Sequence, residues 1–400
     1  MYFFLFRFTA TDRLDLLGPG RAGGRKEPQF FEKTPGSNPN FRSTTTKRSQ
    51  ARPRNDHPCA VQQQSTYFLQ LQTSTNTFIP RQSRTVTMDG WVERLIQRAQ
   101  RKELFRSESA LHEACYASVE LQAVQQILTL HPEANMIADG NGRIPLHWAL
   151  TSKNQHDKAR LLLQHLMAQG ENFPLEEIMM VRNDLGYTAL DHACCTDAPA
   201  DIIESILSMC PQAATSTNTR KLGKTPLHML LEYNKSNGTK MNTASVSLLL
   251  KAFPEAVSVR DRMGNLPLHY AVYSQTNYEA FRLLLSASMR MGCLEVKNEM
   301  GHTILHAACM NDSPVNVFQC LLEAWPCNVG QVDNCGNSPL HLSFAHRTST
   351  ELKSRLIHFG GEELFGAVND RGQIPLQQGL VEDVFSILRL MPHVIRTRVV

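Results

Sequence analysis

Apolar residues recur along this chain as pairs of short runs that repeat every 35 to 44 residues. The first run of each pair starts at a leucine inside a Pro-Leu-His-like motif. The second run places apolar residues at i, i+3 and i+4, as in 124–128 and 318–322, and this spacing is typical of the buried face of an α-helix. Each repeat is therefore predicted to contain two helices.

The motif occurs eight times, with variants such as Thr-Ala-Leu-Asp and Ile-Pro-Leu-Gln. Its leucines are Leu111, Leu146, Leu190, Leu227, Leu268, Leu305, Leu340 and Leu376, which are 35, 44, 37, 41, 37, 35 and 36 residues apart. Several second runs end at a proline, namely Pro132, Pro211, Pro254, Pro326 and Pro392. Proline has no backbone N–H to donate to a continuing helix, so these residues predict where the second helices end.

A glycine lies four residues before the motif leucine in seven of the eight repeats, at a place where a tight turn requires a positive φ. These glycines are Gly142, Gly186, Gly223, Gly264, Gly301, Gly336 and Gly372. Three residues earlier stands an Asp or Asn able to cap the turn, except at Arg220; these residues are Asp139, Asn183, Asp261, Asn298, Asp333 and Asn369. Each unit is therefore predicted to be a hairpin turn followed by two helices.

With these two sets of landmarks, residues 88–400 resemble the ankyrin-repeat family, whose signature is Thr-Pro-Leu-His-x-Ala with a period of about 33 residues. Segment 253–269 resembles in particular the divergent ankyrin arrays of unicellular algae and related protists. The resemblance implies an all-α repeat solenoid of about eight helix–loop–helix units joined by β-hairpin-like fingers.

The spacing also predicts how this part of the chain is divided. Residues 107–400 are predicted to form the repeat domain, 88–106 an N-terminal capping helix, and the last repeat a shortened C-terminal cap, because terminal repeats face water on one side. The two longest intervals predict insertions at 168–176 and 234–243, and the polar composition of the second predicts an exposed loop.

Residues 1–87 differ from the rest in charge and composition. They hold 13 Lys/Arg and 5 Asp/Glu, a balance of +8 that leaves −4 for residues 88–400 out of the overall +4. They lack an apolar period, so we predict a basic, disordered tail. We also hypothesise that Met88 is the biological start and that residues 1–87 are not part of the native protein; native peptides from residues 1–80, found by mass spectrometry, would refute this.

The cysteines are predicted to pack rather than to bind metal. The 10 cysteines form no Cys-x-x-Cys pair, which excludes the common zinc-finger spacings and favours a reducing compartment. Cys115, Cys194 and Cys309 share one slot, four residues after the motif leucine, as expected of small buried residues. A cytoplasmic location is predicted, and a basic cluster at Lys47 and Arg48 leaves nuclear residence open.

No catalytic residue, cofactor, metal or small-molecule substrate is predicted. The resemblance implies that the motif histidines bond hairpin backbone in neighbouring repeats: His112, His147, His228, His269, His306 and His341. The segment 18–23 matches G-x-G-x-x-G but lacks the strand, helix and acidic residue of a dinucleotide site. Only 87 low-complexity residues lie outside the repeats, too few for an added catalytic domain, and no stretch approaches the roughly 18 apolar residues of a membrane span.

The predicted function is that of a non-enzymatic scaffold that binds a partner protein on the concave face of the array. The resemblance assigns partner binding to the residue after each turn glycine and to three tyrosines on the first helices: Arg143, Tyr187, Lys224, Asn265, His302, Asn337, Gln373, Tyr116, Tyr233 and Tyr273. For Trp148, core packing and partner contact are both left open. The alternative is a regulator that binds nucleic acid through the basic tail, although the acidic body argues against nucleic acid there; steeply salt-dependent binding that is lost without residues 1–87 would identify it.

Overall fold

The computed structural model describes residues 88–380, apart from 101–109, 118, 152–154, 238–242 and 276, together with 385–387 and 389. The predicted tail, residues 1–87, and Pro392 lie outside these residues. All described residues belong to one compact unit, Gln64–Val400. Within the predicted capping segment 88–106, helix α2 covers Met88–Gln100 and packs against the first helix pair of the array.

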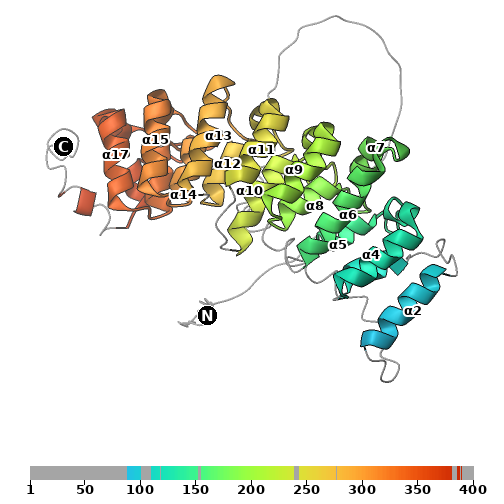
Figure 1. The fold of residues 1–400 in the computed structure, drawn as a ribbon. Helices are drawn as coiled ribbons and strands as arrows, with labels where there is room; N and C mark the ends of the chain where they lie inside the picture. The colour runs from blue at the N-terminus through green and yellow to red at the C-terminus, as the bar shows by residue number, and fades with distance from the viewer. Residues whose placement is uncertain are drawn as a thin grey trace, which may run out of the picture. The chain divides into compact units, whose positions relative to one another are not determined.

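Seven helix pairs follow α2 in the described part of the chain (Figure 1). The first helices are α3 (Ala110–Tyr116), α5 (Pro145–Ala149), α8 (Ala189–Cys195), α10 (Pro226–Asn237), α12 (Pro267–Tyr273), α14 (Ile304–Met310) and α16 (Pro339–Ala345). The second helices are α4 (Leu121–Leu130), α6 (His156–Gln169), α9 (Ala200–Met209), α11 (Thr243–Ala252), α13 (Tyr278–Arg290), α15 (Val315–Ala324) and α17 (Thr350–Gly360). The prediction of two helices per repeat is confirmed in the first seven repeats.

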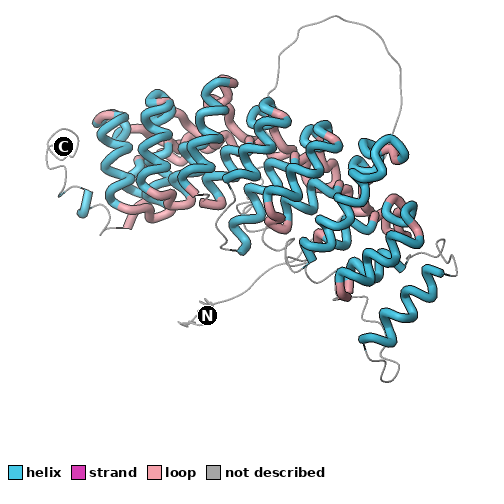
Figure 2. Tube along the Cα trace, in the orientation of Figure 1, coloured by secondary structure: helices cyan, strands magenta, loops and turns pink. Residues whose placement is uncertain are grey.

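The helices form two layers within this unit, because first helices pack on first helices and second helices on second helices. Figure 2 shows the pairs side by side in chain order, with loops between them. One hydrophobic core runs through the array from Leu95 to Ile387, and the motif leucine is at most 1% exposed in the first seven units. Each leucine therefore fills the space between its own pair and the next, as expected of a solenoid.

The second helices end where the prolines predict. Four of them give way to a short 3₁₀ turn whose first residue is the proline: Pro132–Asn135, Pro211–Thr215, Pro254–Ser258 and Pro326–Gly330. Similar turns, Gly170–Asn172 and Glu362–Gly366, follow α6 and α17. A 3₁₀ turn needs no i−4 hydrogen bond, so it accommodates the missing proline N–H and directs the chain toward the next hairpin.

Both predicted insertions contain helix, although the second was predicted to be an exposed loop. The first contains an additional helix, α7 (Leu175–Met180), with Ile178 and Met179 buried. In the second, α10 continues to Asn237, so the first residues of the predicted polar loop 234–243 are helical, and 238–242 lie outside the described residues. Asn and Ser side chains disfavour helix interiors only weakly, and the preceding apolar turns of α10 outweigh that preference.

The eighth unit is described only in part, and its described motif differs from the others. Its motif forms only the 3₁₀ turn Pro375–Gln378, and Leu376 is half-buried. Gln377 stands where most units have histidine, and its side-chain oxygen accepts a hydrogen bond from the N–H of Ile374 at 3.0 Å. Among the helices of the described residues, none is long and apolar enough to cross a membrane.

Candidate partner-binding surface

Each unit from the second onward begins with a finger, a short turn closed by an Asp or Asn side chain. Each finger is numbered by its unit, so the second finger is the first along the chain. In the second unit, Asp139 Oδ1 accepts hydrogen bonds from the N–H groups of Asn141 and Arg143, both at 2.8 Å. The Asp139 N–H also donates to the Arg143 carbonyl at 2.8 Å. These bonds hold Gly142 at φ +70°, which glycine adopts without strain.

The finger of the fourth unit is two residues longer than the others. Asn218, not Arg220, closes it: its N–H donates to the Lys224 carbonyl at 2.9 Å, and its Oδ1 accepts from the N–H groups of Arg220 and Lys221. The apparent exception in the sequence is therefore a longer turn. Its extra length places Leu222 at φ +60°, a region that side chains other than glycine rarely adopt.

The motif histidines link each unit to the next finger, as the resemblance implied. The Nε2 atoms of His112, His147, His228, His269, His306 and His341 bond the carbonyls of Arg143, Tyr187, Asn265, His302, Asn337 and Gln373 at 2.9–3.4 Å. A carbonyl only accepts, so Nε2 carries the hydrogen and Nδ1 can accept, as it does from the N–H of Thr225 at 3.2 Å in His228. We call these six residues the staple histidines.

Burial keeps the staple histidines neutral. It lowers the pKa of His147, His228, His269 and His306 to about 4. A neutral ring fits the observed bonding, because a charged ring would have no acceptor nitrogen at Nδ1. These histidines therefore have a structural role.

The third unit lacks a staple histidine. Asp191 takes the place, and its Oδ2 accepts from the N–H of Thr188 at 3.0 Å, which reproduces the capping half of the role. Burial raises the pKa of Asp191 to about 6. A carboxylate has no N–H, so no equivalent donor from this position reaches the fourth finger.

Neighbouring fingers are also joined directly at their tips. The carbonyl of the residue before each turn glycine accepts a backbone N–H from the next finger: Asn141 from Asp184, Leu222 from Arg262, Met263 from Glu299, Met300 from Asn334 and Cys335 from Asp370, at 2.7–3.1 Å. Between the third and fourth fingers the Asn218 side chain donates to the Leu185 carbonyl instead, at 3.3 Å. The fingers therefore form one continuous, pre-ordered edge.

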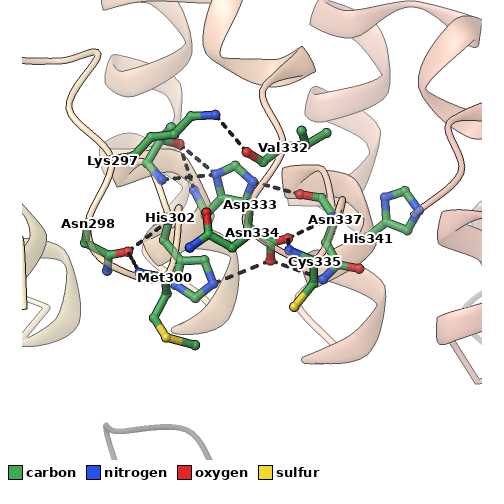
Figure 3. A network of polar contacts seen from close by, with 12 residues as sticks. Lys297, Asn298, Met300, His302, Val332, Asp333, Asn334, Cys335, Asn337 and His341 are labelled. Atoms are coloured by element: carbon green, nitrogen blue, oxygen red, sulfur yellow. Dashed lines mark hydrogen bonds and ion pairs between the residues drawn. The ribbon is translucent and has the colours of Figure 1, made fainter. Parts of the chain in front are cut away.

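Figure 3 shows this arrangement between the sixth and seventh fingers. Lys297 Nζ donates to the Val332 carbonyl at 2.8 Å, and His302 Nε2 lies 3.5 Å from Asp333 Oδ2. Burial alone would raise the pKa of Asp333, but hydrogen bonds from His302 and Asn337 lower it to about 2. The side chains of this region bind neighbouring fingers to each other.

Four of the ten predicted partner-binding residues are buried. Tyr187, Lys224, Asn265 and His302 are only 4–8% exposed, because the residue after the turn glycine directs its side chain back toward the first helix. Lys224 Nζ, for example, pairs with Glu232 at 2.7 Å and lies 4.8 Å from the centre of the Tyr270 ring. These four side chains are not available to a partner, which corrects that part of the predicted surface.

The other six are accessible to different degrees. Arg143, Asn337, Gln373, Tyr233 and Tyr273 are half-buried, and Tyr116 is 40% exposed. Trp148 is half-buried between Tyr116, edge-on at 5.0 Å, and Arg143, 4.5 Å from its ring centre. Its Nε1 donates to Asp139 Oδ2 at 2.8 Å, so Trp148 joins the finger to the helix.

The structure reveals an accessible apolar row that the repeat pattern did not predict. The residue before the turn glycine is apolar in four consecutive fingers: Leu185, Leu222, Met263 and Met300, which we call the finger-tip row. Met300 is 44% exposed and the other three are half-buried. A Leu-Gly or Met-Gly pair inside a turn was the available signal, because turn positions are ordinarily polar.

The cysteines of the repeated slot lie in the core. Cys115, Cys194 and Cys309 are buried, as predicted, and burial raises the pKa of Cys115 to about 12. Within the same residues, no group of three or more His, Cys, Asp or Glu side chains is arranged to hold a metal ion.

Comparison with known proteins agrees with the geometry. The sequence matches the family model for ankyrin repeats in three copies over residues 111–213 and 190–293, and the single ankyrin repeat over 300–334. A Saccharomyces cerevisiae protein named "Probable 26S proteasome regulatory subunit p28" is 26% identical over 231 residues, which cover 58% of this chain and 91% of the yeast protein.

Two solved ankyrin repeat domains are similar to this chain. The ankyrin repeat domain of Bcl-3 has 22% sequence identity and a TM-score of 0.46, and the match covers 62% of this chain and 99% of that one. The human ASB11 ankyrin repeat domain has 21% identity and a TM-score of 0.47, with 62% and 97% covered.

Proposed function

Because the chain belongs to the ankyrin repeat family, we propose that it is a non-enzymatic scaffold that binds a partner protein along its fingers and first helices. The observation that carries the proposal is the finger-tip row, four apolar side chains held in sequence at one edge, of which Met300 is exposed, Leu222 and Met263 are half-buried, and Leu185 also packs against the core. Exposed apolar residues in a row are characteristic of protein-binding surfaces. Leucine supplies apolar contact area and methionine adapts to irregular partners.

Pre-ordering supports the same function. The hydrogen bonds between finger tips fix the row before a partner arrives, so association loses little conformational entropy in the scaffold. Tyr116 adds a large amphipathic side chain at the first-helix side of the same array. The proposed surface thus combines the finger-tip row with the accessible residues of the predicted set.

We expect loss of the finger-tip row to abolish partner capture. The full chain is used to capture proteins from a native extract, beside a triple variant carrying Leu185→Ser, Met263→Ser and Met300→Ser. Removal of three apolar contacts should lower recovery of specific partners by about tenfold or more. Quantitative mass spectrometry measures the recovery, and thermal unfolding checks that both chains are folded.

The matched control replaces exposed apolar residues of the second helices, Leu283→Ser and Met289→Ser on α13, which are 38% and 50% exposed. This variant should capture the same partners as the unchanged chain. Equal recovery by the triple variant would disprove the proposed surface, and loss of recovery by the control would place binding on the second helices.

The yeast relative supplies one specific partner to test. Its name describes a regulatory subunit of the 26S proteasome, a protein assembly, and the match covers almost all of that protein. We propose the 26S proteasome as a second, narrower candidate partner for this chain. Proteasome subunits among the captured proteins, depleted by the triple variant, would support it; capture of other proteins without proteasome subunits would reject it and keep the scaffold.

A further inference from the structure

The fourth and fifth fingers carry an uncompensated positive charge on an otherwise acidic body. Arg220, Arg260 and Arg262 are exposed, and residues 88–400 together have a net charge of −4. Arg260 donates to two carbonyls, those of Lys297 at 2.8 Å and Gly264 at 3.4 Å. Carbonyls are neutral, so the guanidinium charge remains available.

The acidic residue within these two fingers does not cancel that charge. Asp261 is 5% exposed, and both of its oxygens are engaged inside the finger. Oδ1 accepts from the N–H groups of Met263 and Asn265, and Oδ2 accepts from the Tyr270 hydroxyl at 2.7 Å. The third and sixth fingers carry exposed acids, Asp184 and Glu299. Each of these fingers also holds a basic residue, Arg182 or Lys297, so its formal charges cancel. The positive charge is therefore concentrated at the centre of the finger-tip row.

Leu222 lies at that centre in a strained conformation. It precedes Gly223 at φ +60°, and its carbonyl accepts the Arg262 N–H at 2.7 Å. Glycine at this position would remove the strain, and nothing in the packing of the finger requires a leucine, because the side chain is only half-buried. Non-glycine residues at positive φ cluster at ligand-contacting sites, and of the five in the described residues Leu222 is the one that stands at a finger tip between exposed arginines.

We infer that the fourth and fifth fingers bind an acidic segment of the partner protein, with its carboxylates on Arg220, Arg260 and Arg262 and an apolar side chain against Leu222 and Met263. This inference rests on the proposed scaffold function and names the chemistry of the partner. Guanidinium groups bind carboxylates bidentately and stay charged at all physiological pH values. The apolar contact with Leu222 and Met263 fixes where along the fingers the acidic segment binds, which charge alone does not.

A random 12-residue peptide library, panned on the full chain, tests the chemistry without knowledge of the partner. Enriched peptides should combine two or more Asp or Glu residues with a Leu, Met or Phe. In fluorescence anisotropy, Arg220→Glu with Arg262→Glu should raise the Kd of such a peptide by about tenfold or more. The control pair Lys251→Glu and Arg290→Glu, exposed cations on α11 and α13 with the same change in net charge, should alter it by less than about twofold.

The variant Leu222→Gly separates binding from folding. It should raise the midpoint of thermal unfolding by relieving the strain, and still raise the Kd of the peptide by about fivefold or more. Enrichment of neutral or basic peptides that bind the finger-tip row would overturn the acidic partner and leave the scaffold function intact. The triple variant Leu185→Ser, Met263→Ser and Met300→Ser is panned in parallel. If no peptide is enriched on the unchanged chain relative to this variant, the result would count against the scaffold function itself.

Discussion

Acidification from about pH 7 to about pH 4.5 is expected to unfold the repeat domain. Four staple histidines have a folded-state pKa of about 4, below the ordinary 6.5, because they are buried. Between these values the unfolded chain binds more protons than the folded one. The contribution of the histidines to stability is therefore fully present above pH 6.5 and is lost as the pH falls toward 4. Each histidine contributes about 3 kcal/mol to this loss, so the four together remove about as much as a typical folding free energy of about 5–15 kcal/mol.

One buried acid opposes this trend. The pKa of Asp191, raised by burial to about 6, means that the folded state takes up that proton first, which stabilises the fold as the pH falls through 6. A single carboxyl does not balance four histidines. Asp333 has a pKa of about 2, so its contribution to the free energy of unfolding is lost mainly below pH 3.8, the ordinary pKa of an aspartate.

Urea unfolding at a series of pH values, followed by circular dichroism, measures the effect. The variant His228→Gln should lose about 3 kcal/mol less of its free energy of unfolding over this pH range, since one buried histidine is gone. The matched control is His358→Gln, a substitution at an exposed position, which should leave the free energy of unfolding at about pH 7 unchanged. A free energy of unfolding that stays constant from about pH 7 to about pH 5 would contradict neutral, buried staple histidines.

Gly301→Ala is expected to destabilise the domain by about 3 kcal/mol or more. A Cβ at Gly301 would lie 2.5 Å from the backbone nitrogen of Asn334, the atom that donates to the Met300 carbonyl. The alanine therefore forces the sixth and seventh fingers apart and breaks that hydrogen bond. Its φ of +78° adds about 1 kcal/mol of backbone strain.

Gly372→Ala isolates the contribution of the contact between fingers. Gly372 has a similar φ of +74°, but a Cβ there would meet no atom within 4 Å. This substitution should cost only the strain, about 1 kcal/mol. Equal losses for the two variants in urea unfolding would show that the fingers do not support each other, and would weaken the argument for a pre-ordered binding edge.

Residues that recur in most units could be predicted from the sequence. The motif leucine, the staple histidine and the turn glycine each perform one local task, and period and residue type together identify that task. The position of the second-helix ends followed in the same way from Pro132, Pro211, Pro254 and Pro326, because proline acts through its own backbone.

Residues that depend on the length of a loop could not be predicted. Asn218 closes the fourth finger because two additional residues precede Gly223, and no count from the glycine identifies it. Burial of the residue after the glycine could not be predicted either, because it depends on contacts with first helices: Lys224, for example, lies against Glu232 and Tyr270. Helix α7 arises from tertiary burial of Ile178 and Met179, which local propensity does not register.

Asp191 also determines where the array can open. At the six junctions with a staple histidine, separation of two units leaves a buried Nε2–H without its carbonyl, at a cost of about 1 kcal/mol. Separation of the third unit from the fourth breaks no histidine bond, and the Asn218 side-chain bond to the Leu185 carbonyl, at 3.3 Å, is longer than five of those six. Partial unfolding should therefore begin there, so that amide hydrogen exchange resolves units 1–3 and units 4–8 as two blocks with different protection. Installing the missing donor with Asp191→His should merge them, and identical protection on both sides before that change would refute this boundary.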